Sequence, residues 1–196
     1  MTSNQIKEVA LNYFAKHGYE GTSMALIAED VGIKKQSIYT HFKGKDDLFL
    51  QVCSGVFSDQ IRFILDYIES NQACKLEELL YAFILRYKER YERDEATKFW
   101  LRISFFPPNH LYEEVMTLVY ETLDRIEEIL FPIIEKAMQE GEISSEAGGR
   151  RATAAYMGVL DGIFVEMLYG GSDRLNKRIE SSWYLYWRGL SMGLRE

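Results

Sequence analysis

The residue types that could do chemistry gather between Gly32 and Lys45. This segment contains lysines at positions 34, 35, 43 and 45 and no acidic residue, whereas the whole chain has a net charge of -7. Lysine, glutamine and serine side chains near the start of a helix can reach base edges and phosphate oxygens of double-stranded DNA. A local positive segment on an acidic protein indicates specific binding of a polyanion. It argues against a protein that coats nucleic acid through generalised positive charge.

Two short helices joined by a tight turn must position these side chains. Ser23 is a good N-cap for the first helix, which is expected to end at Gly32, because glycine adopts the left-handed conformation that closes a helix. The second helix follows within a few residues, and one side of it is expected to carry Ile38, Tyr39 and Phe42. The pattern predicts a helix-turn-helix.

In this arrangement the outward side chains divide into two sets. The second helix would read bases through Lys35, Gln36 and Ser37, with an apolar contact from Ala25 of the preceding helix. Contacts to the phosphate backbone are expected from Thr22, Ser23, Lys34, Tyr39, His41, Lys43 and Lys45.

Residues Thr22 to Leu48 resemble the DNA-binding domain of the tetracycline-repressor (TetR) family of bacterial transcription regulators. The residues that carry this resemblance are Thr22, Ser23, Ile27, Ala28, Gly32, Tyr39, Phe42 and Lys45, preceded by a helix that ends in Gly18 and Tyr19. Lys34 departs from the family, because many members have a Ser or Thr cap there. Either the start of the second helix is less fixed, or Lys34 is a further phosphate contact.

The resemblance implies an all-α fold in two domains. A three-helix helix-turn-helix DNA-binding domain would cover residues 1–47, and a helical ligand-binding and dimerisation domain would cover residues 48–196. Hydrophobic periodicity agrees, since it predicts helices over about 4–17, 45–70, 76–93, 96–106, 111–140, 147–169 and 174–194. In the family, the long helix that joins the domains transmits ligand binding to the DNA-binding domain.

The last two helices carry more apolar surface than one neighbour can cover, which predicts a homodimer. The expected interface consists of Tyr156, Val159, Ile163, Met167, Trp183, Trp187 and Leu190. A two-fold dimer would read a palindromic operator. The alternative is a monomer in which both helices are deeply buried.

Most of the 13 tyrosines and 11 phenylalanines, and all 3 tryptophans, lie after position 50. An apolar effector pocket with hydroxyl groups is predicted, formed by Tyr67, Tyr87, Tyr91, Trp100, Phe105, Tyr120, Asp124, Tyr156 and Phe164. The alternative is that these aromatic residues are ordinary core. The mid-helix acids Asp124, Asp161 and Glu166 raise the hypothesis of a cationic aromatic ligand, although acids on helices usually face solvent.

Several function classes find no support in the sequence. The two cysteines, Cys53 and Cys74, form no disulfide framework and indicate a reducing compartment. No signal peptide is recognised, and the apolar segment 152–169 contains Asp161 and Glu166, which would be costly in a bilayer. A cytoplasmic protein without membrane contact is expected. No metal, nucleotide or nucleophile motif occurs, so no catalytic residue, metal or cofactor is expected.

Together these features predict a ligand-responsive transcriptional repressor that a small hydrophobic or aromatic molecule releases from its operator. The alternative is a helical small-molecule binding or scaffold protein whose basic N-terminal part contacts an acidic partner protein.

Overall fold

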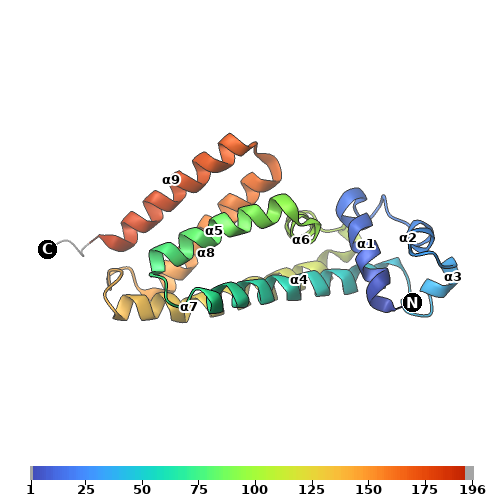
Figure 1. The fold of residues 1–196 in the computed structure, drawn as a ribbon, viewed down its shortest axis with the longest axis horizontal. Helices are drawn as coiled ribbons and strands as arrows, with labels where there is room; N and C mark the ends of the chain where they lie inside the picture. The colour runs from blue at the N-terminus through green and yellow to red at the C-terminus, as the bar shows by residue number, and fades with distance from the viewer. Residues whose placement is uncertain (1, 193–196) are drawn as a thin grey trace. The chain divides into compact units, whose positions relative to one another are not determined.

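The computed structural model describes residues 2–192 and contains no β-strand in that range. Figure 1 shows its helices, which are α1 (Ser3–His17), α2 (Met24–Val31), α3 (Lys35–Ile38), α4 (Lys45–Ser70), α5 (Leu76–Arg93), α6 (Glu95–Phe105), η1 (Asn109–Leu111), α7 (Tyr112–Gln139), α8 (Gly149–Tyr169) and α9 (Ser172–Ser191). The all-α prediction is confirmed. The expected extension of the last helix to Leu194 lies outside the described residues.

The chain forms two compact units that do not follow the expected boundary at residue 47. Unit 1 consists of residues 1–60 and 91–122, and unit 2 consists of residues 61–90 and 123–196. The difference arises because α6 packs against α1, which brings part of the later chain into the first unit. The division into a DNA-binding and a ligand-binding domain remains a prediction about function.

Local signals set the helix ends in unit 1. Thr2 and Gln5 form a capping box at the start of α1, and the Ser23 hydroxyl accepts a hydrogen bond from Leu26 N at the start of α2. Gly32 has φ 77° and ψ 31°, and its N–H donates to the carbonyls of Ala28 and Glu29. This left-handed conformation is the reason a glycine is needed after α2.

The core of unit 1 forms where α1, α2, α3 and the start of α4 meet. Its most buried side chains include Ile6, Phe14, Ile27, Ile38, Phe42, Leu48 and Phe49. The prediction that Tyr39 lies on the same side of the helix as Ile38 and Phe42 is wrong, since Tyr39 is 49% exposed whereas the other two are buried. Tyr39 still has a helical backbone, with φ -69° and ψ -7°, and successive helical residues point about 100° apart, so Tyr39 points away from the buried side of Ile38.

Unit 2 is held together by contacts among α5, α8 and α9. The Tyr156 hydroxyl donates to the Leu80 carbonyl at 2.7 Å, and the Tyr186 hydroxyl donates to the Ala152 carbonyl at 3.0 Å. The rings of Tyr81 and Trp183 lie 5.2 Å apart. Through these contacts, the inner faces of α8 and α9 are buried inside the protomer.

Among the described helices, α4 is long and apolar enough to cross a membrane by length and composition. It has a mean hydropathy of 1.3, and 44% of the apolar window is buried inside the protein. The core helix of a soluble protein passes the same test, so α4 is weak support for a membrane span.

Candidate functional site

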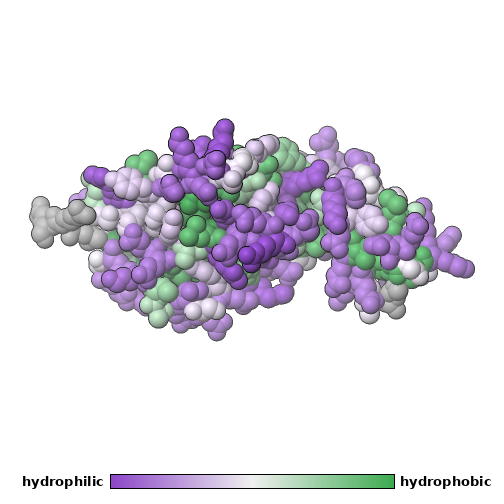
Figure 2. Space-filling model, turned by 45° about the horizontal axis from the view of Figure 1, so that its top comes forward, coloured by the Kyte–Doolittle hydropathy of each residue, from purple (hydrophilic) through white to green (hydrophobic). Residues whose placement is uncertain are grey.

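The turn between α2 and α3 places the predicted base-reading residues at the surface of unit 1. Lys35, Gln36 and Ala25 are exposed, and Ser37 is half-buried. Ile38, which follows them, is fully buried and fixes α3 to the core. Hydrophilic side chains project from this end of the unit in Figure 2. In this arrangement the exposed side chains can place their hydrogen-bonding groups in a groove of DNA.

Most of the predicted phosphate contacts are also exposed, namely Ser23, Lys34, Tyr39, His41 and Lys43. Lys34 occupies the N-cap position of α3 and forms no side-chain cap, as expected for a residue without an acceptor oxygen. The backbone before α4 is fixed by Asp47, whose Oδ2 accepts from Lys43 N at 2.7 Å. Hydrogen bonds from Gln51 and from the Lys43 backbone lower the pKa of Asp47.

Thr22 is a correction to the sequence prediction. Its side chain is 2% exposed, and its hydroxyl donates to the Gly18 carbonyl at 2.8 Å. A buried hydroxyl cannot reach a phosphate, so Thr22 stabilises the turn between α1 and α2 instead.

Lys45 has an internal role that the sequence did not reveal. Its Nζ donates to the carbonyls of Tyr19 and Thr22, at 3.1 and 3.2 Å, and lies 3.9 Å from the centre of the Tyr19 ring. Two of the three ammonium hydrogens are therefore used within the protein. Lys45 connects the start of α4 to the turn that precedes α2.

A polar cluster of Tyr19, Asp46 and His110 lies beside this contact. The Tyr19 hydroxyl donates to Asp46 Oδ1, and His110 Nε2 lies 3.6 Å from the same oxygen. Burial, followed by the hydrogen bond to Asp46, raises the pKa of Tyr19. His110 is distant in sequence from the other two residues, and no sequence signal predicted that it joins them.

The predicted effector pocket divides between core and surface. In unit 2, Tyr87, Tyr156 and Phe164 are at most 5% exposed, and the rings of Tyr87 and Phe164 lie 4.8 Å apart. Tyr67 is half-buried, and its hydroxyl donates to the Leu79 carbonyl. It lines a cavity of about 10 Å³ among Ile64, Ile68, Leu79, Leu80, Phe83 and Leu130. A cavity of this size holds about one water molecule, so it cannot hold an effector in this conformation.

The other pocket candidates lie elsewhere. Phe105 and Tyr120 are 39% and 59% exposed, and Asp124 is also exposed, and none of the three lines the cavity beside Tyr67. Trp100 is buried in unit 1 against Phe57, and Tyr91 is half-buried. Aromatic type and helical spacing did not distinguish a pocket wall from core or from surface.

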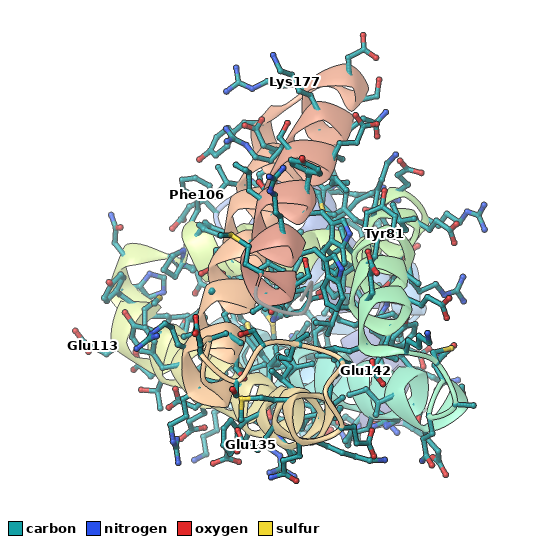
Figure 3. All side chains as sticks on the ribbon, turned by 90° about the vertical axis from the view of Figure 1, so that its left-hand side faces the viewer. Tyr81, Phe106, Glu113, Glu135, Glu142 and Lys177 are labelled. Atoms are coloured by element: carbon teal, nitrogen blue, oxygen red, sulfur yellow. The ribbon has the colours of Figure 1, made fainter. Side chains whose placement is uncertain are left out.

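Unit 2 has a pocket of about 520 Å³ that sequence reasoning missed. It lies where the end of α4, the start of α5 and the end of α7 meet. Its apolar wall includes Ile68, Leu76, Leu79, Ile133 and Ala137, and its polar residues include Lys75, Lys136 and Glu142. Glu142, labelled in Figure 3, accepts a hydrogen bond from Leu76 N and caps α5. The volume lies within the range of small-molecule sites.

Glu166 is not available as a carboxylate for the hypothetical cationic ligand. Glu166 is 5% exposed, and its carboxylate accepts hydrogen bonds from Arg174 Nε at 2.8 Å and Arg178 Nη2 at 3.0 Å. It joins α8 to α9 inside the protomer and is not open to a ligand. Asp161 is exposed on α8, where partial burial still raises the pKa of its carboxyl.

The residues predicted to form the dimer interface largely face inward. Tyr156, Ile163, Met167, Trp183 and Leu190 are each no more than 9% exposed, so their assignment to an interface between copies is wrong. Val159 and Trp187 are half-buried. The apolar stripes of α8 and α9 pack against other helices of the same protomer.

A different face of α8 and α9 is exposed. On α8 it is formed by the small residues Ala154, Ala155 and Gly158 with half-buried Gly162, followed by Val165 and Tyr169, and the exposed Asp161 lies on the same side. On α9 it includes Tyr184 and Leu185, which are 59% and 69% exposed. Small residues allow close approach of another helix, so this face is suited to a second copy.

The chain is similar to known transcriptional regulators. Residues 6–52 match the family described as bacterial regulatory proteins, tetR family. The chain is 28% identical over 127 residues to the biofilm operon icaADBC HTH-type negative transcriptional regulator IcaR of Staphylococcus epidermidis, covering 61% of this chain and 66% of IcaR. It is 27% identical over 174 residues to the HTH-type transcriptional regulator AcrR of Shigella flexneri, covering 86% of this chain and 79% of AcrR.

The fold is also similar to that of a solved structure. The transcriptional regulator FadR from Bacillus subtilis, in complex with stearoyl-CoA, superposes with a TM-score of 0.71 at 20% sequence identity. The similarity covers 96% of this chain and 100% of the FadR chain. The same helical fold therefore extends beyond the helix-turn-helix into both units.

Proposed function

The chain belongs to the TetR family of bacterial regulatory proteins, and from this premise we propose that it is a transcriptional repressor released from its operator by a hydrophobic or aromatic molecule. The observation that carries the proposal is the surface formed by α2 and α3. There, exposed Lys35 and Gln36 stand on a helix that buried Ile38 anchors to the core. IcaR is named as a negative regulator, which supports repression here.

In this proposal, a homodimer binds a palindromic operator in the cytoplasm through two copies of the helix-turn-helix. The protomers associate through the exposed small-residue face of α8 and the adjoining surface of α9. Lys35, Gln36, Ser37 and Ala25 contact bases. Ser23, Lys34, Tyr39, His41 and Lys43 contact phosphates, to which the remaining hydrogen of the Lys45 ammonium adds.

An effector would bind in unit 2 and shift the dimer toward a form with lower operator affinity. FadR was solved with stearoyl-CoA, which supports a ligand with a large apolar part. The pocket of about 520 Å³ with its wall of Ile68, Leu76, Leu79 and Ile133 offers an apolar surface for it. Because coupling between two binding sites is reciprocal, operator DNA would weaken effector binding by the same factor.

Fluorescence anisotropy tests the proposal directly. The purified protein is titrated into a labelled duplex from upstream of its own coding region and into a scrambled duplex of equal length. The proposal expects tight binding to the first and weak, salt-sensitive binding to the second. Equal binding to the two duplexes, and to duplexes that tile the neighbouring genes, would overturn sequence-specific regulation.

Two exposed residues provide matched variants for this assay. Gln36→Ala is expected to change the preferred sequence, since a bidentate base contact supplies about 1–3 kcal/mol of discrimination. Lys43→Ala is expected to weaken binding to both duplexes and to lower the slope of log K against log salt by about one. Identical changes from the two substitutions would contradict this division between base and phosphate contacts.

A further inference from the structure

Unit 1 also contains a pocket, of about 350 Å³, and the proposed function does not use it. It lies between the end of α1 and the following turn on one side and α6 with the segment up to Asn109 on the other. Residues from the DNA-reading part of the chain and residues from α6 therefore share one cavity. The volume is sufficient for a small organic molecule.

The floor of this pocket is aromatic. Phe49 is the centre of the group, and its ring lies 4.9 Å from that of Phe14, 5.2 Å from Tyr19 and 5.8 Å from Phe99, each at close to a right angle. Phe106 adds a further ring that is 54% exposed. Phe14, Phe49 and Phe99 are each 1% exposed and form the closed base of the pocket, so a planar ring placed here would contact Tyr19 and Phe106.

One guanidinium supplies a charge at this aromatic floor. Arg102 is exposed, and no hydrogen bond or ion pair joins its side chain to another described residue. It lies against the turn at Gly18, where a Cβ would come within 3.4 Å of Arg102 Nη2. This guanidinium can therefore accept a ligand without breaking an existing ion pair.

Two other ionisable side chains line the same pocket. His17 supplies a ring nitrogen that can donate, and Glu20 supplies a carboxylate that forms no ion pair with Arg102. The carboxylate of Glu20 disfavours ligands with several negative charges, since it repels each of them. A ligand with one negative charge and one aromatic ring suits this combination of groups.

We propose that this pocket binds a small aromatic monocarboxylate, with its ring against Tyr19 and Phe106 and its carboxylate on Arg102. The planar guanidinium can bind both carboxylate oxygens, which fixes the orientation of the ring as well as its charge. Such a ligand would bridge α1 and α6 within unit 1. It is an effector site in the unit that reads DNA, additional to the proposed effector site in unit 2.

Benzoate is the probe, and the intact protein is titrated with it while amide chemical shifts are recorded by NMR. The expected result is a saturable shift of the Gly18 amide at millimolar benzoate. Benzyl alcohol, which has the ring without the charge, is expected to bind more weakly. No saturable shift at Gly18 with benzoate would overturn the proposal.

Three variants separate ligand binding from a general effect on the fold. Arg102→Gln is expected to weaken benzoate binding roughly tenfold because it removes a charge-assisted pair. Arg125→Gln is the matched control, since Arg125 is an exposed arginine of unit 2 that pairs with Glu128. The benzoate affinity of this variant should equal that of the wild type. Glu20→Gln is expected to strengthen binding by removing repulsion. Unchanged affinity in both Arg102→Gln and Glu20→Gln would also overturn the proposal.

Discussion

Two residues that contact the turn between α1 and α2 have a structural role that their residue types do not suggest. Thr22 and Lys45 resemble phosphate ligands in the sequence, but the structure uses the hydroxyl of Thr22 and two hydrogens of the Lys45 ammonium for backbone carbonyls. Both residues hold the segment that leads into α2. The position of α2 and α3 thus depends on side-chain contacts within the protein as well as on the residues that are proposed to contact DNA.

Lys45→Ala is expected to lower the free energy of unfolding by about 1–2 kcal/mol, because it leaves two carbonyls without their ammonium donor. The measurement is thermal or urea unfolding of the purified protein. Lys43→Ala is the control, since the Lys43 side chain is exposed and its backbone hydrogen bond to Asp47 is retained. If Lys45→Ala unfolded at the wild-type midpoint and lost only salt-dependent DNA affinity, Lys45 would be a phosphate contact alone.

At the scale of helices, the sequence predicts an element well where a local signal sets its ends. Ser23 and Gly32 bound α2 as expected, and α4 runs over the predicted residues 45–70. The direction in which a helix faces was harder to predict. The apolar stripe of α8 indicates burial, but whether a neighbouring helix or a second copy buries it depends on the tertiary arrangement.

The candidate sites differ in the same way. The residues of the proposed DNA-binding surface are close together in sequence, so their types and spacing alone allowed a prediction, and most of them are exposed in the structure. Arg102 and Gly18 are far apart in sequence and meet only because α6 packs on α1. No periodicity in either segment indicates that contact, which is why the pocket between them could not be predicted.

The link between α8 and α9 through Glu166 should make stability depend on pH. Hydrogen bonds from Arg174 and Arg178 lower the pKa of the Glu166 carboxyl. A carboxyl whose pKa is lowered by folding stabilises the protein above its unfolded pKa of about 4.3, and this stabilisation is lost as the pH falls through the folded pKa. Glu166→Gln should therefore lower the melting temperature at neutral pH, and the difference from the wild type should shrink in acid.

Melting curves from about pH 7 down to pH 3 test this expectation, since that range covers the titration of carboxyl groups. Glu128→Gln is the control, because Glu128 forms an exposed pair with Arg125 and such pairs contribute little to stability. A melting-temperature difference for Glu166→Gln that stays constant over the whole range would show that charge at position 166 is unimportant.

For the whole molecule, we expect association of two copies to depend on the small-residue face of α8. A Cβ at Gly158 would meet no atom within 4 Å in the protomer, so a larger side chain there leaves the protomer intact. Gly158→Lys is expected to give a monomer in light scattering and to lose most operator affinity, because a dimer engages two half-sites. Gly158→Ala is the control.

The alanine control should remain a dimer and should increase the free energy of unfolding by about 0.5–1 kcal/mol, as alanine favours a helix over glycine. A Gly158→Lys protein that remained a dimer would place the contact between copies on another face.

The shortness of α3 has a thermodynamic consequence for operator binding. A helix of four residues without a side-chain cap cannot persist alone in water, and α3 is fixed mainly through buried Ile38. Its exposed residues should exchange their amide hydrogens rapidly in the free protein and slowly on DNA. Operator association should then show a favourable enthalpy and an opposing entropy, as is typical when a segment becomes ordered on binding. The affinity of this regulator would therefore depend on temperature more strongly than that of one whose recognition helix is already rigid.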